Sequence, residues 1–161
     1  GPYGCPTLTD AAWRWGGEPE TTKPTFMGGR HAVMPGWAAV VGEQGVADVS
    51  AYVVTSLHGR KLPEGAKADP ANGQKLFAAN CVACHGPAGK GTPAMGAPDL
   101  THPAGFIYGS SFAQLQQTIR YGRQGQMPAQ ADLQGNTKLH LLAGYVYSLP
   151  HGEPAPAADA Q

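Results

Sequence analysis

Apolar side chains recur every three or four residues in the last third of the chain, which is the spacing of one face of an α-helix. This face predicts a helix over residues 137–149 that ends at Pro150. A similar face lies around residues 46–53, and no stretch alternates apolar and polar residues as a strand does, so the pattern predicts an all-α fold. The apolar members of the two faces are Leu139, Leu142, Val146 and Leu149, and Val46, Val49 and Val53.

Two further helices are predicted from their end signals. Asp69 is a capping residue, and Pro70 after it is the residue favoured in a first helical turn, so a helix is expected to run from here toward Cys81. Another helix is expected from about residue 111 to Tyr121. It ends at Gly122, because glycine readily adopts the left-handed conformation that follows many helices.

The chain contains an internal repeat. Residues 29–35 match residues 122–128 at an offset of 93, and residues 15–16 and 51–53 match 108–109 and 144–146 at the same offset. We therefore interpret the chain as two copies of one small domain. The first copy covers residues 1–58 and lacks its beginning, residues 59–68 form a linker, the second copy covers residues 69–150, and residues 151–161 form a disordered tail.

Charge is scarce and balanced in this chain. Its 161 residues include 11 Lys and Arg against 11 Asp and Glu, so no basic excess favours nucleic acid. No apolar run reaches the roughly 18 residues of a membrane span. Glycine (23) and proline (15) are abundant, which favours short helices joined by long loops. Small domains of that kind usually need a covalent cross-link or a buried cofactor to complete the core. Because the chain begins without Met, we interpret it as the interior of a longer protein, with any targeting segment upstream.

The strongest chemical motif is Cys81-Val82-Ala83-Cys84-His85, the C-x-x-C-H sequence of covalent c-type haem attachment. Two thiols near a helix end reach the two vinyl groups of haem, and the adjacent imidazole binds the iron. A zinc site would need a second ligand pair, and a thioredoxin-like redox pair would need a βαβ setting that the helical pattern lacks. The motif therefore predicts one haem c bound at Cys81 and Cys84, with His85 as an iron ligand.

The other axial ligand of that iron is predicted from the repeat. Met127 has a counterpart in Met34, and proline follows each of them, whereas Met95 has no methionine counterpart. Met127 also follows His85 by 42 residues, which leaves room for the chain to wrap around the haem. We therefore expect His85 and Met127 to bind the iron. Such ligation leaves no open site, so it favours one-electron transfer over oxygen activation.

The pattern from Gly73 and Phe77, through the haem motif, to Met127 and Tyr145 resembles class I cytochromes c. The resemblance implies two tandem class I cytochrome c domains, the first truncated at its N-terminus. It also implies that the first and last helices of a domain cross, with Gly73 and Phe77 against Tyr145. A proline carbonyl in the loop after the motif is expected to orient the proximal imidazole, and Pro93 is the expected carrier.

Four stretches, at residues 13–20, 28–35, 77–86 and 124–129, resemble the di-haem cytochrome c subunit (subunit III) of cbb3-type cytochrome c oxidases. This resemblance implies an electron-transfer subunit on the periplasmic face of the bacterial inner membrane, held by an anchor outside this sequence. Such a subunit takes electrons from a soluble cytochrome c donor and passes them to the mono-haem and catalytic subunits of a proton-pumping oxidase in aerobic respiration. The resemblance implies no catalysis by this chain alone and a second haem in the first copy, with Met34 on its iron.

The sequence departs from that family at three points. No C-x-x-C-H motif precedes Met34, so a second haem depends on residues outside this chain. Thr22 and Pro24 interrupt a predicted helix and are expected to shorten or kink it, since an interior proline costs about 3 kcal/mol. Cys5 stands where the repeat has Ala97, and we expect it to be a small buried residue. Three cysteines do not make a closed disulfide framework.

Four further residues are candidates for haem contacts. Arg30 and Arg123 precede the two methionines at equivalent positions, and arginine suits a haem propionate. Trp15 and Tyr121 are candidates for contacts with haem edges, with ordinary core packing as the alternative. The remaining histidines are expected at the surface rather than on iron: His31, His58, His102, His140 and His151.

Two other functions stay open at this stage. A free periplasmic di-haem carrier of the same fold would differ from the oxidase subunit by having no membrane anchor. A di-haem peroxidase would need an iron that opens its sixth site, and a methionine ligand argues against that. Binding of carbon monoxide to the reduced protein at neutral pH would favour the peroxidase.

Overall fold

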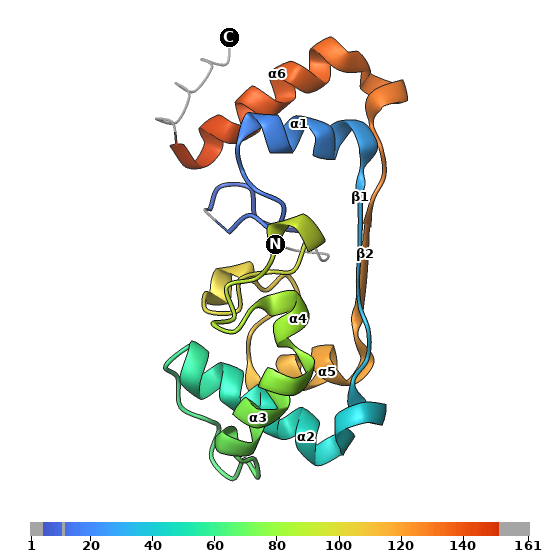
Figure 1. Ribbon diagram of the computed structural model, residues 1–161. Helices are drawn as coiled ribbons and strands as arrows, with labels where there is room; N and C mark the ends of the chain where they lie inside the picture. Colours follow the sequence, from blue (N-terminus) through green and yellow to red (C-terminus); the bar gives the residue numbers. More distant parts are fainter. Residues whose placement is uncertain (1–4, 11, 152–161) are drawn as a thin grey trace.

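The computed structural model describes residues 5–10 and 12–151 (Figure 1). Beyond its first residue, the tail predicted for residues 151–161 lies outside this range. Every helix in the described part is too short or too polar to cross a bilayer. In chain order the elements are α1 (Pro19–Gly28), β1 (Arg30–Met34), α2 (Ala38–Tyr52), the π-helix η2 (Val53–Leu57), α3 (Pro70–Asn80), α4 (Val82–His85), the 3-10 helices η3 (Pro93–Met95) and η4 (Pro103–Gly105), α5 (Phe112–Tyr121), β2 (Arg123–Met127) and α6 (Ala131–His151).

The end signals predicted for α3 and α5 are confirmed. Asp69 caps α3 by accepting a hydrogen bond from a backbone N–H of the first turn at 2.8 Å. Ser111 and Gln114 cap α5 reciprocally, and Gly122 follows the helix with a φ of 74°. The helix predicted over residues 137–149 is the second part of α6, which bends at Gly135 (φ 72°). The predicted end at Pro150 is wrong, because α6 includes Pro150 and ends at His151.

The internal repeat is visible as two copies of a helix–strand–helix unit. The first copy consists of α1, β1 and α2, and the second of α5, β2 and α6, with each element starting 93 residues after its counterpart. The last helix of each copy bends at an equivalent glycine, Gly42 and Gly135. The repeat seen in the sequence is therefore a repeat of structure.

Two departures from the repeat have effects other than those expected. Pro24 lies inside α1, yet α1 has ten residues, as α5 does, so the helix is not shortened. The neighbouring Thr22 is buried, and its hydroxyl donates to the Gly17 carbonyl at 3.2 Å, which ties the start of α1 to the preceding loop. Cys5, expected to be buried, is exposed.

The prediction of an all-α fold is wrong, because β1 and β2 pair as a two-stranded antiparallel sheet (Figure 1). Arg30 lies opposite Met127 at one end of the register, and Met34 lies opposite Arg123 at the other. β2 is Arg-Gln-Gly-Gln-Met, without apolar alternation, so nothing local indicates a strand. The hydrogen-bond partner of each strand lies in the other repeat, and tertiary context of this kind overrides local propensity.

Gly29 and Gly122 allow the two strands to approach the ends of the helices. They follow α1 and α5 and have φ values of 68° and 74°. A side chain at Gly29 would collide with the Met127 carbonyl oxygen, and a side chain at Gly122 would collide with the Met34 carbonyl oxygen. Both positions therefore require glycine for its positive φ and for the close backbone contact.

The prediction of two tandem domains is also wrong, because the repeats exchange their last helices. α2 packs against α3 and α5, whereas α6 packs against α1. The molecule is elongated, with the α1–α6 pair at one end, the α2, α3 and α5 helices at the other, and the sheet running between them (Figure 1). The two last helices have similar apolar faces, so the sequence pattern alone does not decide which body each one joins.

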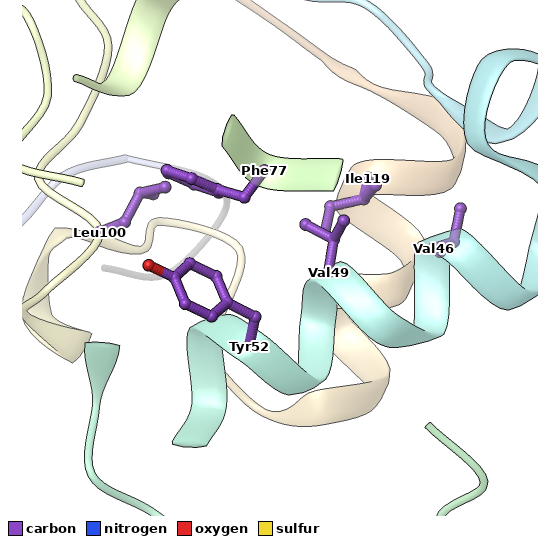
Figure 2. Close-up of a cluster of buried hydrophobic side chains, with 6 residues drawn as sticks. All are labelled: Val46, Val49, Tyr52, Phe77, Leu100 and Ile119. Atoms are coloured by element: carbon purple, nitrogen blue, oxygen red, sulfur yellow. The ribbon is translucent and has the colours of Figure 1, made fainter. Parts of the chain in front are cut away.

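The larger core lies between α2, α3 and α5 (Figure 2). Tyr52 and Phe77 are in contact there, with ring centroids 5.3 Å apart. The position expected for Tyr145 is thus occupied by Tyr52, its counterpart in the first repeat, and Tyr145 is 60% exposed on α6. The buried members of this core are Val46, Val49, Tyr52, Phe77, Leu100 and Ile119, and those of the smaller core between α1 and α6 are Phe26, Leu139, Ala143 and Val146.

Candidate functional site

The C-x-x-C-H motif lies where α3 passes into the one-turn helix α4. The backbone N–H of Cys81 donates to the Phe77 carbonyl, and that of His85 donates to the Cys81 carbonyl, both at 2.9 Å. Cys81 is half-buried, Cys84 is exposed and His85 is buried. A single turn of backbone therefore presents two thiols and an imidazole together at the end of α3.

A cavity of about 270 Å³ opens beside this turn. Its walls come from α2, α3, α5, β1 and the loop that follows α4, and Cys81, Cys84 and His85 line it. Apolar groups form most of the remaining wall, and they include Val49, Val53, Phe77, Leu100, Phe106 and Ile119. The motif thus faces an apolar space, which is the surrounding that a flat, largely apolar macrocycle requires.

The imidazole of His85 is held by the loop that follows α4. Its Nδ1 lies 3.2 Å from the carbonyl oxygen of Pro98, so Nδ1 carries the proton and Nε2 is left as the free ring nitrogen. We expected the carbonyl of Pro93 in this role, but Pro93 begins η3 at an exposed position. Gly91 closes the loop by donating its N–H to the His85 carbonyl at 2.9 Å. The hydrogen bond to Pro98 fixes the ring orientation that a metal ligand needs.

Burial favours the neutral forms of two groups in this turn. It lowers the pKa of His85, the hydrogen bond to Pro98 opposes this, and the charge of Arg14 lowers the pKa further. Neutral imidazole is the form that binds a metal. Burial also raises the pKa of the Cys81 thiol to about 11. At neutral pH the motif therefore presents a neutral imidazole and a protonated Cys81 thiol to the cavity.

Arg14 provides the test of whether the cavity suits haem. Its side chain lines the cavity, and its Nε is buried with no hydrogen-bond partner among the described residues. Burial lowers the pKa of this guanidinium. Arg14 is half-buried, and a cation whose Nε is withdrawn from water without a partner is destabilised. A carboxylate in the cavity would relieve that cost. Haem carries two propionates, so the residues present fit the group that the motif implies.

Sequence reasoning missed Arg14 as a site residue. It belongs to the first repeat and is remote in sequence from the haem motif, so spacing gave no reason to connect the two. The available signal was a charged residue between two bulky aromatic ones, Trp13 and Trp15, in a chain with little charge. Such a setting is unusual for a solvated charge, because arginine is seldom buried without a partner.

The two arginines predicted to bind propionates lie in equivalent settings. The guanidinium of Arg123 is 4.3 Å from the centre of the Tyr108 ring, and its Nε donates to Thr118. Arg30 repeats this arrangement with Trp15 at 4.5 Å and with the corresponding threonine of α1. Arg123 lines the cavity beside the haem motif, whereas Arg30 lines a shallow depression at the other end of the sheet.

The remaining predicted site residues are not brought to the cavity. Trp15 packs beside Gly96 and is not part of the lining, and Tyr121 is 75% exposed. Met95, which the repeat argument set aside, does line the cavity from η3, although its side chain is 53% exposed.

The structure separates the two methionines predicted as iron ligands. Met34 lines the cavity and packs against the core that contains Phe77. Met127 packs against the other core, with Phe26, and is not among the cavity residues. Of the two, Met34 is therefore the one that shares a cavity with His85.

A zinc site finds no support in the described part of the chain. No three His, Cys, Asp or Glu side chains gather there in a group that could hold a metal ion. The cysteines of the motif are accompanied by a single histidine, as haem attachment requires.

Comparisons with known proteins agree with this site. Residues 68–146 match the family model described as cytochrome c oxidase, cbb3-type, subunit III. The FixP subunit of Bradyrhizobium sp. (strain ORS 278) is 38% identical over 95% of this chain and 55% of its own length. The CcoP subunits of Rubrivivax gelatinosus and Cereibacter sphaeroides are 39% and 33% identical over 92% and 95% of the chain, and over 47% and 54% of their own lengths.

The chain spans about half the length of the curated relatives it matches. The matched segment begins just before α3 and ends within α6, so it includes the haem motif and the loop that holds His85. Residues 68–146 belong to the family of cbb3-type cytochrome c oxidase subunit III, and the chain is a homologue of the FixP and CcoP subunits over most of its length.

Proposed function

We propose that this chain is the electron-transfer part of a cbb3-type oxidase subunit, with haem c bound at Cys81 and Cys84. The observation that carries the proposal is the single turn that presents two thiols and a buried imidazole to an apolar cavity. The unpaired Nε of Arg14 in the same cavity supports it, because it supplies a cation for a propionate. The names of the relatives support the assignment to an oxidase subunit.

The cofactor would supply reversible one-electron exchange, and the chain supplies the setting. Cys81 and Cys84 would hold the group through thioether bonds, and His85 would give its Nε2 to the iron. The hydrogen bond to Pro98 keeps the imidazole oriented, which limits the rearrangement that each electron transfer requires. The apolar wall excludes water and so favours the less charged, reduced state.

Electrons would enter and leave at the edge of the group next to Cys84. This cysteine is exposed, whereas Cys81 and His85 lie deeper. The chain has no net charge, so long-range steering of a partner is weak and contacts around that edge would decide docking. We propose a soluble cytochrome c as the donor, and the mono-haem and catalytic subunits of the oxidase as the acceptors.

The cellular placement follows from the same proposal. A subunit of a membrane oxidase that receives electrons from a soluble cytochrome c works on the periplasmic face of the inner membrane. Covalent haem attachment also takes place in that compartment. A second haem in the first repeat would need a C-x-x-C-H motif, which residues 1–58 do not contain.

Replacing both motif cysteines tests the proposal. We expect C81A/C84A to lose covalent haem completely, because no thioether can form, while C5A keeps the full amount. Haem staining of a denaturing gel and the mass of the intact chain, produced with a c-type maturation system, report both outcomes. A wild-type chain that emerges from such cells without haem would contradict the proposed function.

A further inference from the structure

We propose that Met34 of the first repeat, not Met127, is the sixth ligand of the iron at His85, because the two repeats exchange their last helices. The inference rests on the proposed function, since it requires haem at Cys81 and Cys84. It assigns one iron a ligand set drawn from both repeats.

The first reason is the register of the sheet. Met34 lies opposite Arg123, which lines the cavity, and Met127 lies opposite Arg30, which does not. In an antiparallel pair of five residues, the first and last positions are separated by the length of the strand, roughly 13 Å. The sheet therefore holds one methionine at the cavity and the other away from it.

The second reason is the helix that follows each methionine. α2 follows Met34 and packs on α3, the helix that leads into the haem motif. The contact is close, because a side chain at Gly73 would collide with the Asp48 carbonyl oxygen. Figure 2 shows Val49 and Tyr52 of α2 in the same core as Phe77 of α3. The chain after Met34 is thus anchored to α3 and the helices around it. We call this group, made of α2, α3, α4 and α5, the haem-binding body.

The corresponding face of α6 has no such cover. Leu142 and Tyr145, the counterparts of Val49 and Tyr52, are 40% and 60% exposed, whereas Val49 and Tyr52 are 3% and 8% exposed. The chain after Met127 is therefore packed through other residues, against α1. In the haem-binding body, the face of α2 that carries Val49 and Tyr52 is therefore buried, and the corresponding face of α6 is not.

The third reason is a polar contact that only α2 makes. Asp48 is 2% exposed, and its carboxylate accepts hydrogen bonds from the Asp69 N–H and the Asn72 amide, each at 2.8 Å. A further bond comes from Gln44 at 2.8 Å. The residue of α6 at the position of Asp48 is Leu141, which has no acceptor for these donors. The start of α3 is therefore complementary to α2 and not to α6.

Met95 is the remaining methionine at the cavity. It lies in η3, within the loop whose Pro98 carbonyl accepts from Nδ1 of His85. Pro98 contacts Nδ1, so this loop supports the imidazole at the ring nitrogen other than Nε2, the one that would bind the iron. A loop that already holds the imidazole on one side is poorly placed to supply a second ligand to the same iron, so we assign that role to Met34, the other methionine that lines the cavity.

Three matched variants of the haem-loaded chain test the inference: M34A, M127A and M95A. A thioether on ferric iron gives a weak charge-transfer band at the red edge of the visible spectrum. We expect M34A to lose this band and to bind carbon monoxide when reduced, while M127A and M95A keep the band. Retention of the band in M34A, or its absence from the wild-type chain, would overturn the inference.

A cross-link tests the exchange without relying on the iron. The Gln44 amide donates to the Lys67 carbonyl at 3.1 Å, both residues are exposed, and Thr137 stands at the position of Gln44 in the second repeat. In a haem-loaded C5A background, we expect a short bis-maleimide to link Q44C/K67C within the monomer but not K67C/T137C. Efficient linking of K67C/T137C in place of Q44C/K67C would overturn the exchange.

These readouts separate the two proposals. Haem staining of the same variants reports whether the cofactor is attached, which is the requirement of the proposed function. The red-edge band and the cross-link report which repeat completes the site. A chain with covalent haem that depends on Met127 would keep the proposed function and reject the inference, whereas a chain without haem would reject both.

Discussion

At the scale of single residues, Arg14 contributes a positive charge where the cofactor is expected. Its Nε has no partner within the described residues, and it lies close enough to His85 to lower the pKa of that imidazole. Arg14 is half-buried, so water screens its charge less than it screens a charge on the open surface. Oxidation adds one positive charge to the iron, so a neighbouring cation favours the reduced state.

We expect R14L to lower the midpoint potential of the haem-loaded chain. Loss of the cation removes a stabilising influence on the reduced state and leaves a propionate without its partner. A tenfold change in the equilibrium corresponds to about 59 mV for one electron, and we expect a fall on the order of that size. Redox titration followed in the visible spectrum measures it.

The control is R30L, because Arg30 is an arginine of the same repeat that lines the depression at the far end of the sheet and not the cavity. Its potential is expected to stay at the wild-type value. Equal shifts in the two variants would show that Arg14 has no specific contact with the cofactor.

At the scale of elements, the attachment of α2 to α3 depends on a buried carboxylate. Burial raises the pKa of Asp48, but hydrogen bonds from Asp69, Asn72 and Gln44 outweigh it, so the pKa is lowered. A carboxyl whose folded pKa lies below its unfolded value of about 3.9 stabilises the fold above that value. The contribution is lost as the pH falls through the folded pKa.

We expect D48N to lower the free energy of unfolding at pH 7 by about 1.5–3 kcal/mol, the usual cost of losing hydrogen bonds to a charged group. The difference from the wild-type chain should shrink as the pH falls from about 4 through the lowered pKa of Asp48, because the wild-type carboxyl then becomes neutral, as the Asn side chain is at every pH. Urea titrations of the haem-loaded proteins between pH 3 and 7 measure this. A difference that stays constant across that range would contradict the role of the charge.

The helices were predictable from the sequence and the strands were not. Capping residues such as Asp69 and Ser111 act within one turn, so their effects are visible locally. The pairing of β1 with β2 depends on a partner about 93 residues away, and no local pattern reports it. Likewise, the cysteines and His85 of the site were readable as a motif. The core against which each methionine packs could not be predicted, because the helices that follow the two methionines have similar apolar faces.

At the scale of the whole molecule, the exchange ties the two repeats into one structural unit. The lower body in Figure 1 takes α2 from the first repeat and α3, α4 and α5 from the second. Its core needs Val46 and Val49 from one side of the connecting segment, and Phe77 from the other. Neither repeat alone contains a complete haem-binding body.

We therefore expect a nick in the connecting segment to leave the two pieces together. Limited trypsin digestion should cut after the exposed residues Arg60 or Lys61. The N-terminal fragment should then elute with the haem-containing fragment in size-exclusion chromatography, because α2 remains buried against α3 and α5. Adding 6 M urea should separate the fragments. Separation in native buffer would contradict the exchange.

The segment between η2 and α3 also determines which molecule supplies α2. Only twelve residues lie between Leu57 and Pro70, and Gln44 contacts the last part of this segment through the Lys67 carbonyl. A tether this short gives an effective local concentration on the order of millimolar. At micromolar dilution, the α2 of a second copy cannot compete with the attached one. The chain is therefore expected to remain a monomer despite swapping its helices.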